Sequence, residues 1–139
     1  MNPIYRYKWN KETGMSICTI EYNGFKFYGY AQCSPEDEEY KSEFIGGELA
    51  TWRAEIKYMK YIKRCELEPR AQAYYHLAGT MRHSKQHNPK SYEAKRLCQE
   101  YKNIMDTIDD INEEINKTQV MIEEYCRQLD KIHNKAKNK

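Results

Sequence analysis

The chain has 139 residues, of which 40% are hydrophobic and 32% are charged, and its formal net charge is +2. A chain of this size forms one domain with a modest core, and so small a net charge excludes the uniform field of a DNA mimic or a histone-like protein. Acidic residues nevertheless prevail in 34–48 and basic residues in 49–96, which predicts a surface of two signs.

No apolar run approaches the roughly 18 to 20 residues that a membrane span requires, and no segment has the pattern of a signal peptide. We therefore expect no membrane partner and a cytoplasmic location. The five cysteines are odd in number and form no close pair. This pattern argues against a disulfide framework and a zinc knuckle, and indicates reduced thiols that are mostly buried.

Residues 1–33 are predicted to form a three-stranded antiparallel β-meander, because apolar and polar residues alternate in three runs. Asn23-Gly24 is a strong signal for a two-residue type I′ turn, in which both residues adopt positive φ. Such a turn sets the register, which pairs Ile20 with Phe27 on an apolar face of the sheet.

The other face of this sheet is predicted to be aromatic, since the same register places Tyr28 and Tyr30 there. The first strand adds its own aromatic residues to that face if the loop from Asn10 to Gly14 closes symmetrically. An aromatic platform can stack nucleic-acid bases, but such a face more often packs on the protein's own helices or on another subunit. The predicted aromatic face consists of Tyr5, Tyr7, Trp9, Tyr28 and Tyr30.

An acidic connector at 34–47 is predicted to begin with a capped helical turn and to end in a joint at Gly46-Gly47. The following segment, 48–88, has the spacing of two medium helices, with Pro69 starting the second. The inner face of the second helix would carry Ala73, Tyr74, Leu77 and Met81.

The first of these helices carries a row of cations beside its apolar stripe, which we call the basic ridge. Such a ridge suits a phosphate backbone or an acidic partner, whereas a solvated helix face explains it equally simply. The basic ridge consists of Arg53, Lys57, Lys60, Lys63 and Arg64.

Residues 89–135 carry an unbroken heptad repeat with no Pro or Gly after Lys90, which predicts a long helix of the coiled-coil type. Two shorter helices folded back as a hairpin would cover only its first half, so the second half would need another subunit. Helices lying end to end, or a bend of the long helix near Asn116, would remove that need. The predicted oligomer seam includes Ile108, Ile111, Ile115, Ile122, Tyr125, Leu129 and Ile132.

The chain has no strong motif for catalysis. His76, His83 and His87 with Cys65 or Cys98 contain usable zinc ligands, but their spacing matches no known zinc site, and no glycine-rich phosphate loop is present. We therefore expect no metal, no cofactor and no enzymatic activity.

Residues 27–61 (FYGYAQCSPEDEEYKSEFIGGELATWRAEIKYMKY) and the segment NPKSYE at 88–93 resemble small accessory proteins carried by phages of low-GC Gram-positive bacteria. Proteins of that class include anti-defence factors such as anti-CRISPR proteins, which act by binding a host effector or its signal. The resemblance implies action in the cytoplasm of the host cell and assigns no residue a role.

The sequence thus predicts an α+β protein: an N-terminal three-stranded β-meander, two medium helices and a long C-terminal helix that mediates homo-oligomerisation. The expected function is a non-enzymatic binding protein, a phage inhibitor that docks on a host protein such as a nucleic-acid-handling effector. Two alternatives stay open: direct nucleic-acid binding by the basic ridge, and an oligomeric sponge that holds a nucleotide signal between subunits.

Overall fold

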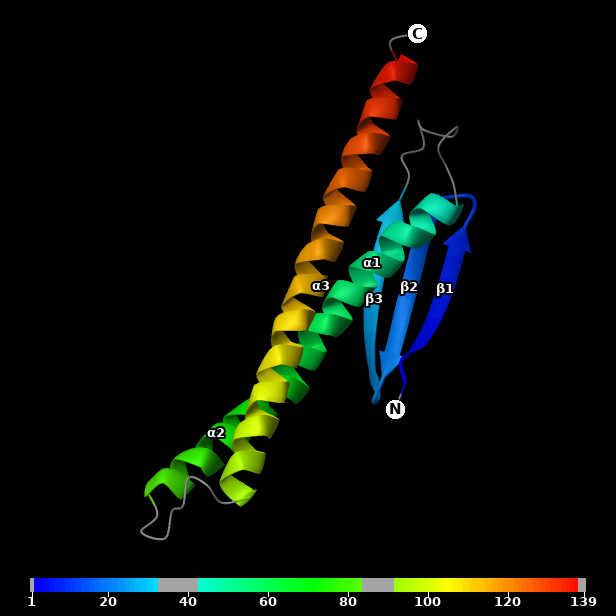
Figure 1. Cartoon of the computed structure of the whole chain (residues 1–139). Coiled ribbons are helices and arrows are strands. Elements are labelled where there is room, and N and C mark those ends of the chain that lie inside the picture. Colours follow the sequence, from blue (N-terminus) through cyan, green and yellow to red (C-terminus); the bar gives the residue numbers. More distant parts are fainter. Residues whose placement is uncertain (1, 33–42, 84–91, 138–139) are drawn as a thin grey trace. The chain divides into compact units, whose positions relative to one another are not determined.

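The computed structural model describes residues 2–32, 43–83 and 92–137, and it confirms the α+β architecture (Figure 1). None of the helices in these ranges is long and apolar enough to cross a bilayer. The elements are β1 (Ile4–Asn10), β2 (Met15–Tyr22), β3 (Phe25–Gln32), α1 (Glu43–Tyr61), the π-helical segment η2 (Ile62–Leu67), α2 (Glu68–His83) and α3 (Tyr92–Lys137).

The chain divides into two compact units, which we describe separately. The sheet unit comprises Met1–Met59 and Ile115–Lys139, and the helical unit comprises Lys60–Glu114. Helix α3 therefore contributes its C-terminal half to the first unit and its N-terminal half to the second. The acidic connector lies mostly outside the described residues, and Gly46-Gly47 is not a joint, because both residues belong to α1.

The sheet is an antiparallel meander in the order β1-β2-β3. The turn between β2 and β3 has the predicted form, with φ of 50° at Asn23 and 81° at Gly24. The register is the predicted one as well, because Ile20 pairs with Phe27. This confirms that a two-residue turn carries enough information to align two strands.

The predicted aromatic face is wrong for the first strand. Tyr7 pairs with Cys18, so the aromatic residues of β1 share the face of Cys18 and Ile20 and lie opposite Tyr28 and Tyr30. We call the face of Cys18 the inner face and that of Tyr28 the outer face.

The loop between β1 and β2 explains this difference. Symmetric closure would pair Asn10 with Gly14, whereas the structure pairs Asn10 with Met15. Gly14 stays inside the loop with φ of 72°, and its N–H donates to the Asn10 carbonyl at 2.8 Å. The Asn10 side chain accepts two further loop N–H groups, from Glu12 and Thr13. A shift of one residue moves every side chain of a strand to the other face.

Helix α1 covers the inner face by an approach close enough to bring its backbone against β3. A Cβ at Gly29 would collide with the Ala50 carbonyl and lie 2.5 Å from the Ala54 nitrogen. Ala50 and Ala54 are fully buried in a cluster with Cys18 and Ile20. This cluster of small and apolar side chains is the core of the sheet unit.

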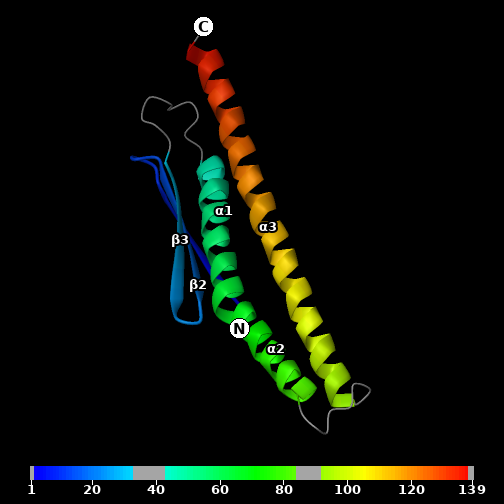
Figure 2. The same cartoon turned by 90° about the vertical axis from the view of Figure 1, so that its left-hand side faces the viewer.

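The C-terminal half of α3 packs on the other side of α1, which therefore lies between the sheet and α3 (Figure 2). Ile122, Tyr125 and Leu129 contact the same core cluster, and the rings of Trp52 and Tyr125 meet edge to face with centroids 5.4 Å apart. This half of the seam was expected to lack cover within the subunit, and that expectation is wrong.

In the helical unit, the chain runs from α1 through η2 into α2 without leaving the right-handed helical region. Pro69 was predicted to start a new helix, because proline removes a donor and crowds the carbonyl four residues earlier. The wider π-turn accommodates it: the Glu68 N–H bonds to the Lys63 carbonyl, five residues back. The two predicted helices are thus one continuous helical segment.

The core of the helical unit is formed by Leu67 and Ala71 against Ile104 and Ile108 of α3, with Ile111 packed beside them. The predicted inner face of the second helix is confirmed at Tyr74, which packs on this core, and wrong at Ala73 and Leu77, which are exposed. The side chain of Met81 lies outside the described residues. The buried positions Leu67 and Ala71 lie in the π-turn and just after it, where the wider turn departs from the spacing of an ordinary helix.

The predicted oligomer seam is thus covered within a single chain along most of its length. Ile108 and Ile115 are each only 7% exposed, and the side chain of Ile132 lies outside the described residues. Homo-oligomerisation stays a prediction, and the uncovered seam on which it depended is not present among the described residues.

We expect Gly29→Ala to lower the free energy of unfolding by about 3 kcal/mol, because the added methyl group meets the α1 backbone and not a yielding side chain. Urea denaturation followed by circular dichroism measures this loss. Gly79→Ala is the matched control, since a Cβ there meets nothing within 4 Å, and alanine in a helix should raise stability by up to about 1 kcal/mol.

We expect Ile108→Ala to cost about 2 to 4 kcal/mol through the cavity that it leaves, by an amount that is independent of protein concentration. Val120→Ala, at a 51% exposed position of the same helix, should have little effect. Denaturation at two concentrations tenfold apart tests this. A denaturation midpoint that rises with protein concentration would instead support burial of the seam between subunits.

Candidate functional site

A pocket of about 550 Å³ opens on the inner face between β1 and α1. A volume of this order is typical of ligand sites. Helix α1 lies against β3 at Gly29, whereas on β1 Tyr5 and Tyr7 stay 49% and 44% exposed. The lining residues are Tyr5, Arg6, Tyr7, Cys18, Gly47, Glu48, Thr51 and Trp52; we call this space the inner-face pocket.

Tyr7 is held in one orientation at the rim of this pocket. Its hydroxyl donates to Oγ of the fully buried Ser16 at 3.4 Å. The ring lies so close to Gly47 that a Cβ there would be 2.7 Å from the hydroxyl oxygen. Glycine within α1 therefore permits this close approach, and Tyr7 presents a fixed aromatic wall.

Carboxylates of α1 give the surroundings of the pocket a negative character. Burial and the nearby Glu55 raise the pKa of the Tyr5 phenol. Burial and Glu48 likewise raise the pKa of Tyr125. For the Cys18 thiol, burial and Glu55 raise the pKa, while a hydrogen bond with Thr51 opposes the rise.

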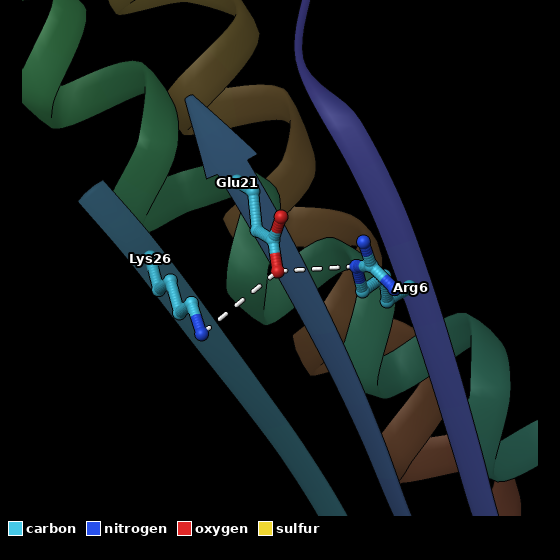
Figure 3. Close-up of polar contacts among 3 residues, drawn as sticks. All are labelled: Arg6, Glu21 and Lys26. Atoms are coloured by element: carbon cyan, nitrogen blue, oxygen red, sulfur yellow. Dashed lines mark ion pairs between the residues drawn. The ribbon is translucent and has the colours of Figure 1, made fainter. Parts of the chain in front are cut away.

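The outer face of the sheet has the opposite charge. Arg6 Nε lies 3.1 Å and Lys26 Nζ 4.0 Å from the same oxygen of Glu21 (Figure 3). Lys8 lies on this face as well and is exposed. Two cations thus flank the Glu21 carboxylate, and the outer face carries a third cation at Lys8. The guanidinium of Arg6 is directed away from the inner-face pocket although the residue borders it.

Strand β1 is an edge strand of the described sheet, and alternate backbone groups of this strand are directed away from β2. The carbonyls of Tyr28 and Tyr30 accept hydrogen bonds from side chains of α1, so they are directed away from β2. Because backbone direction alternates along a strand, the N–H and C=O of Gly29 between them are directed toward β2. Gly29 pairs with Cys18, so the N–H and C=O of Cys18 bond to β3. The N–H and C=O of Tyr7, which pairs with Cys18, therefore face outward, as do those of every second residue of β1.

Two members of the basic ridge close the opposite edge of the sheet. Arg53 Nη1 donates to the Tyr30 carbonyl and Lys57 Nζ to the Tyr28 carbonyl, each at 2.6 Å. Lys57 also lies 5.9 Å from the centroid of the Tyr30 ring, in the range of a cation–π contact. Edge strands are commonly protected in this way. Both cations therefore bind the sheet edge of their own chain, and their assignment to a ligand-binding ridge stays a prediction.

The other three members of the basic ridge belong to the helical unit. Lys60 and Arg64 are exposed, and Lys63 Nζ lies 4.0 Å from a Glu68 oxygen. Because η2 begins at Ile62, the helical spacing that defined the ridge does not continue through these residues.

The prediction of mostly buried cysteines is wrong for the four described ones, and Cys33 lies outside the described residues. Cys18 is buried, whereas Cys65 and Cys98 are exposed and Cys126 is half-buried. Among the described residues, no three metal-ligating side chains gather; the side chain of His83, and His87, lie outside them. A smaller pocket of about 270 Å³ in the helical unit is lined largely by apolar side chains, with Glu68 and Gln72 at its border.

Comparison with known proteins gives no independent guide to function. No protein-family model matches the chain, and neither a curated protein nor a solved structure is similar to it. The resemblance to phage accessory proteins therefore stays a prediction.

Sequence reasoning missed Glu48 and Thr51 as residues of the site. It assigned Glu48 to the start of a helix and gave no role to Thr51. The available signal was the pair Gly46-Gly47 just before them, since two adjacent glycines in a helix indicate close contact with another element.

We expect iodoacetamide to modify Cys65 and Cys98 at least about tenfold faster than Cys18 at pH 8, because burial excludes the reagent and the raised pKa lowers the thiolate fraction. The rate at Cys18 should increase further as the pH rises above 9. Mass spectrometry of the digested protein reads each cysteine separately. After unfolding in urea, the three cysteines should react at equal rates. Equal rates in the native protein would contradict the buried position of Cys18.

Proposed function

We propose that the chain is a non-enzymatic binding protein that holds an extended segment of a partner protein along the open edge of β1. The observation that carries the proposal is the outward direction of alternate backbone groups of β1, those of Tyr5 among them, beside exposed aromatic side chains and the inner-face pocket. In strand addition, main-chain hydrogen bonds supply affinity and adjoining pockets supply specificity.

The charges of the outer face favour an acidic partner segment. Residues of an added strand that lie opposite Arg6 and Lys8 would contact two cations, of which only Arg6 has an ion-pair partner among the described residues. Opposite charges at such positions stabilise strand pairing. A segment with acidic residues at alternate positions therefore suits this edge.

The same charges disfavour a second copy of the chain. If the whole of β1 paired antiparallel with β1 of a second copy, the pairing would centre on Tyr7. Each copy's Arg6 would then lie opposite the other copy's Lys8. Like charges directly opposite one another are destabilising. The partner is thus a different protein.

The role expected from the resemblance is inhibition of a host defence effector, and strand addition provides a means. A segment of the effector that is held in the extended form along β1 is withheld from its own partners. No catalytic group is needed for such an inhibitor. This role is part of the proposal and does not depend on the basic ridge.

Site-directed photocrosslinking tests the proposal. A benzophenone amino acid in place of Tyr5 should give a specific adduct with one protein in the lysate of a low-GC Gram-positive host that carries a CRISPR system. The same group in place of Tyr75, a 63% exposed residue of α2, is the matched control. The double change R6E and K8E should reduce the Tyr5 adduct at least about tenfold.

Equal adducts from both positions, or an adduct that survives the double charge reversal, would contradict binding along β1. The alternative of nucleic-acid binding by the basic ridge predicts that reversing the charges of Arg53, Lys57, Lys60 and Arg64 abolishes binding and that affinity falls steeply with salt.

A further inference from the structure

The inner-face pocket has aromatic walls and an acidic border. Tyr5, Tyr7 and Trp52 supply the rings, and Glu48 supplies a carboxylate. Rings present negative faces to a cation, and their apolar surface accommodates an aliphatic stem. These features together suit a long side chain that ends in a cation.

Glu48 is half-buried, and within the described part of the chain no cation forms an ion pair with it. Arg6, which also borders the pocket, directs its guanidinium to Glu21 on the outer face. A carboxylate that is partly removed from water gains more from a paired cation than a fully exposed one does. Burial is the main cause of the raised pKa values of Tyr5 and Tyr125, and the negative charges of Glu55 and Glu48 raise them further.

We infer that this pocket binds the guanidinium or ammonium group of an arginine or lysine side chain carried by the segment that pairs with β1. The inference rests on the proposed function and deepens it, since it specifies one residue of the partner segment. Glu48 contacts the cation, and the aromatic rings contact its stem.

The alternation of a β-strand places this residue in the partner sequence. Side chains of an added strand that lie opposite Arg6 and Lys8 are on the outer face, so the residue between them, opposite Tyr7, is on the inner face. The outer positions favour acidic residues. The recognised segment therefore has a basic residue between two acidic residues.

A blocked peptide, acetyl-Thr-Val-Glu-Arg-Glu-Val-Thr-amide, carries this pattern and serves as the probe. Its binding is followed by NMR through the Trp52 indole and the Thr51 amide. One control peptide has citrulline, a neutral isostere, in place of arginine. A second has glutamine in place of both glutamates.

The citrulline peptide should bind at least about tenfold more weakly than the arginine peptide. Glu48→Gln should weaken the arginine peptide by a similar factor and the citrulline peptide less than twofold, which isolates the pairwise contact. Glu124→Gln, an exposed position on α3, should change neither affinity. The spectrum of the free variant shows whether it folds.

A separate measurement uses acetyl-arginine methylamide and its citrulline analogue, which cannot add a strand. Greater shifts at Trp52 with the arginine compound than with the citrulline compound are expected, at millimolar concentrations. Equal shifts would overturn the inference even if the peptides bind. The arginine peptide should bind at least tenfold more tightly than the arginine compound; equal affinity would overturn the assignment of the cation to a paired segment.

The proposed function fails in a different way. If the glutamine peptide binds as tightly as the parent, the acidic contacts with Arg6 and Lys8 are absent. If no peptide binds while the arginine compound does, strand addition is contradicted and the cation site remains.

Discussion

The contact between the backbones of α1 and β3 determines the rest of the sheet unit. Gly29, Ala50 and Ala54 lack the side-chain bulk that usually separates a helix from a sheet, so α1 lies directly on the third strand. Because dispersion and apolar burial depend on close packing, this contact anchors the helix on one side of the sheet. The inner-face pocket lies beside β1, where Tyr5 and Tyr7 are only partly covered.

The same placement of α1 decides the chemistry of both sheet edges. From its position over β3, the helix directs Arg53 and Lys57 to edge carbonyls that would otherwise face solvent. On β1, by contrast, alternate backbone groups are directed away from β2, and the outer face beside them carries the cations of Arg6 and Lys8.

The parts of this fold that could be predicted from sequence are those set by local chemistry. Asn23-Gly24 defines a turn with one solution, so the register of β2 and β3 follows. The loop after Asn10 has two closures that differ by one residue, and hydrogen bonds made by the Asn10 side chain and by Gly14 favour the one that reverses the face of Tyr5 and Tyr7. Hydrophobic periodicity does not distinguish between them.

The helices illustrate a second limit. The heptad pattern of α3 identified the residues that are buried, but a pattern cannot say whether the cover comes from another chain or from α1 and α2. Pro69 indicated a break, and only the π-turn explains why the helix continues. The inner-face pocket was beyond prediction for the same reason, since it joins strand and helix residues that are between 29 and 47 positions apart in the sequence.

The two edges of the sheet differ in a way that limits the size of any assembly. Cationic side chains occupy the carbonyls at one edge, so further growth of the sheet in that direction is blocked. At the other edge, like charges oppose pairing between identical copies. If partners bind by the proposed strand addition, each complex contains one copy of each protein, and the described sheet offers identical copies no favourable edge along which to grow into a fibre.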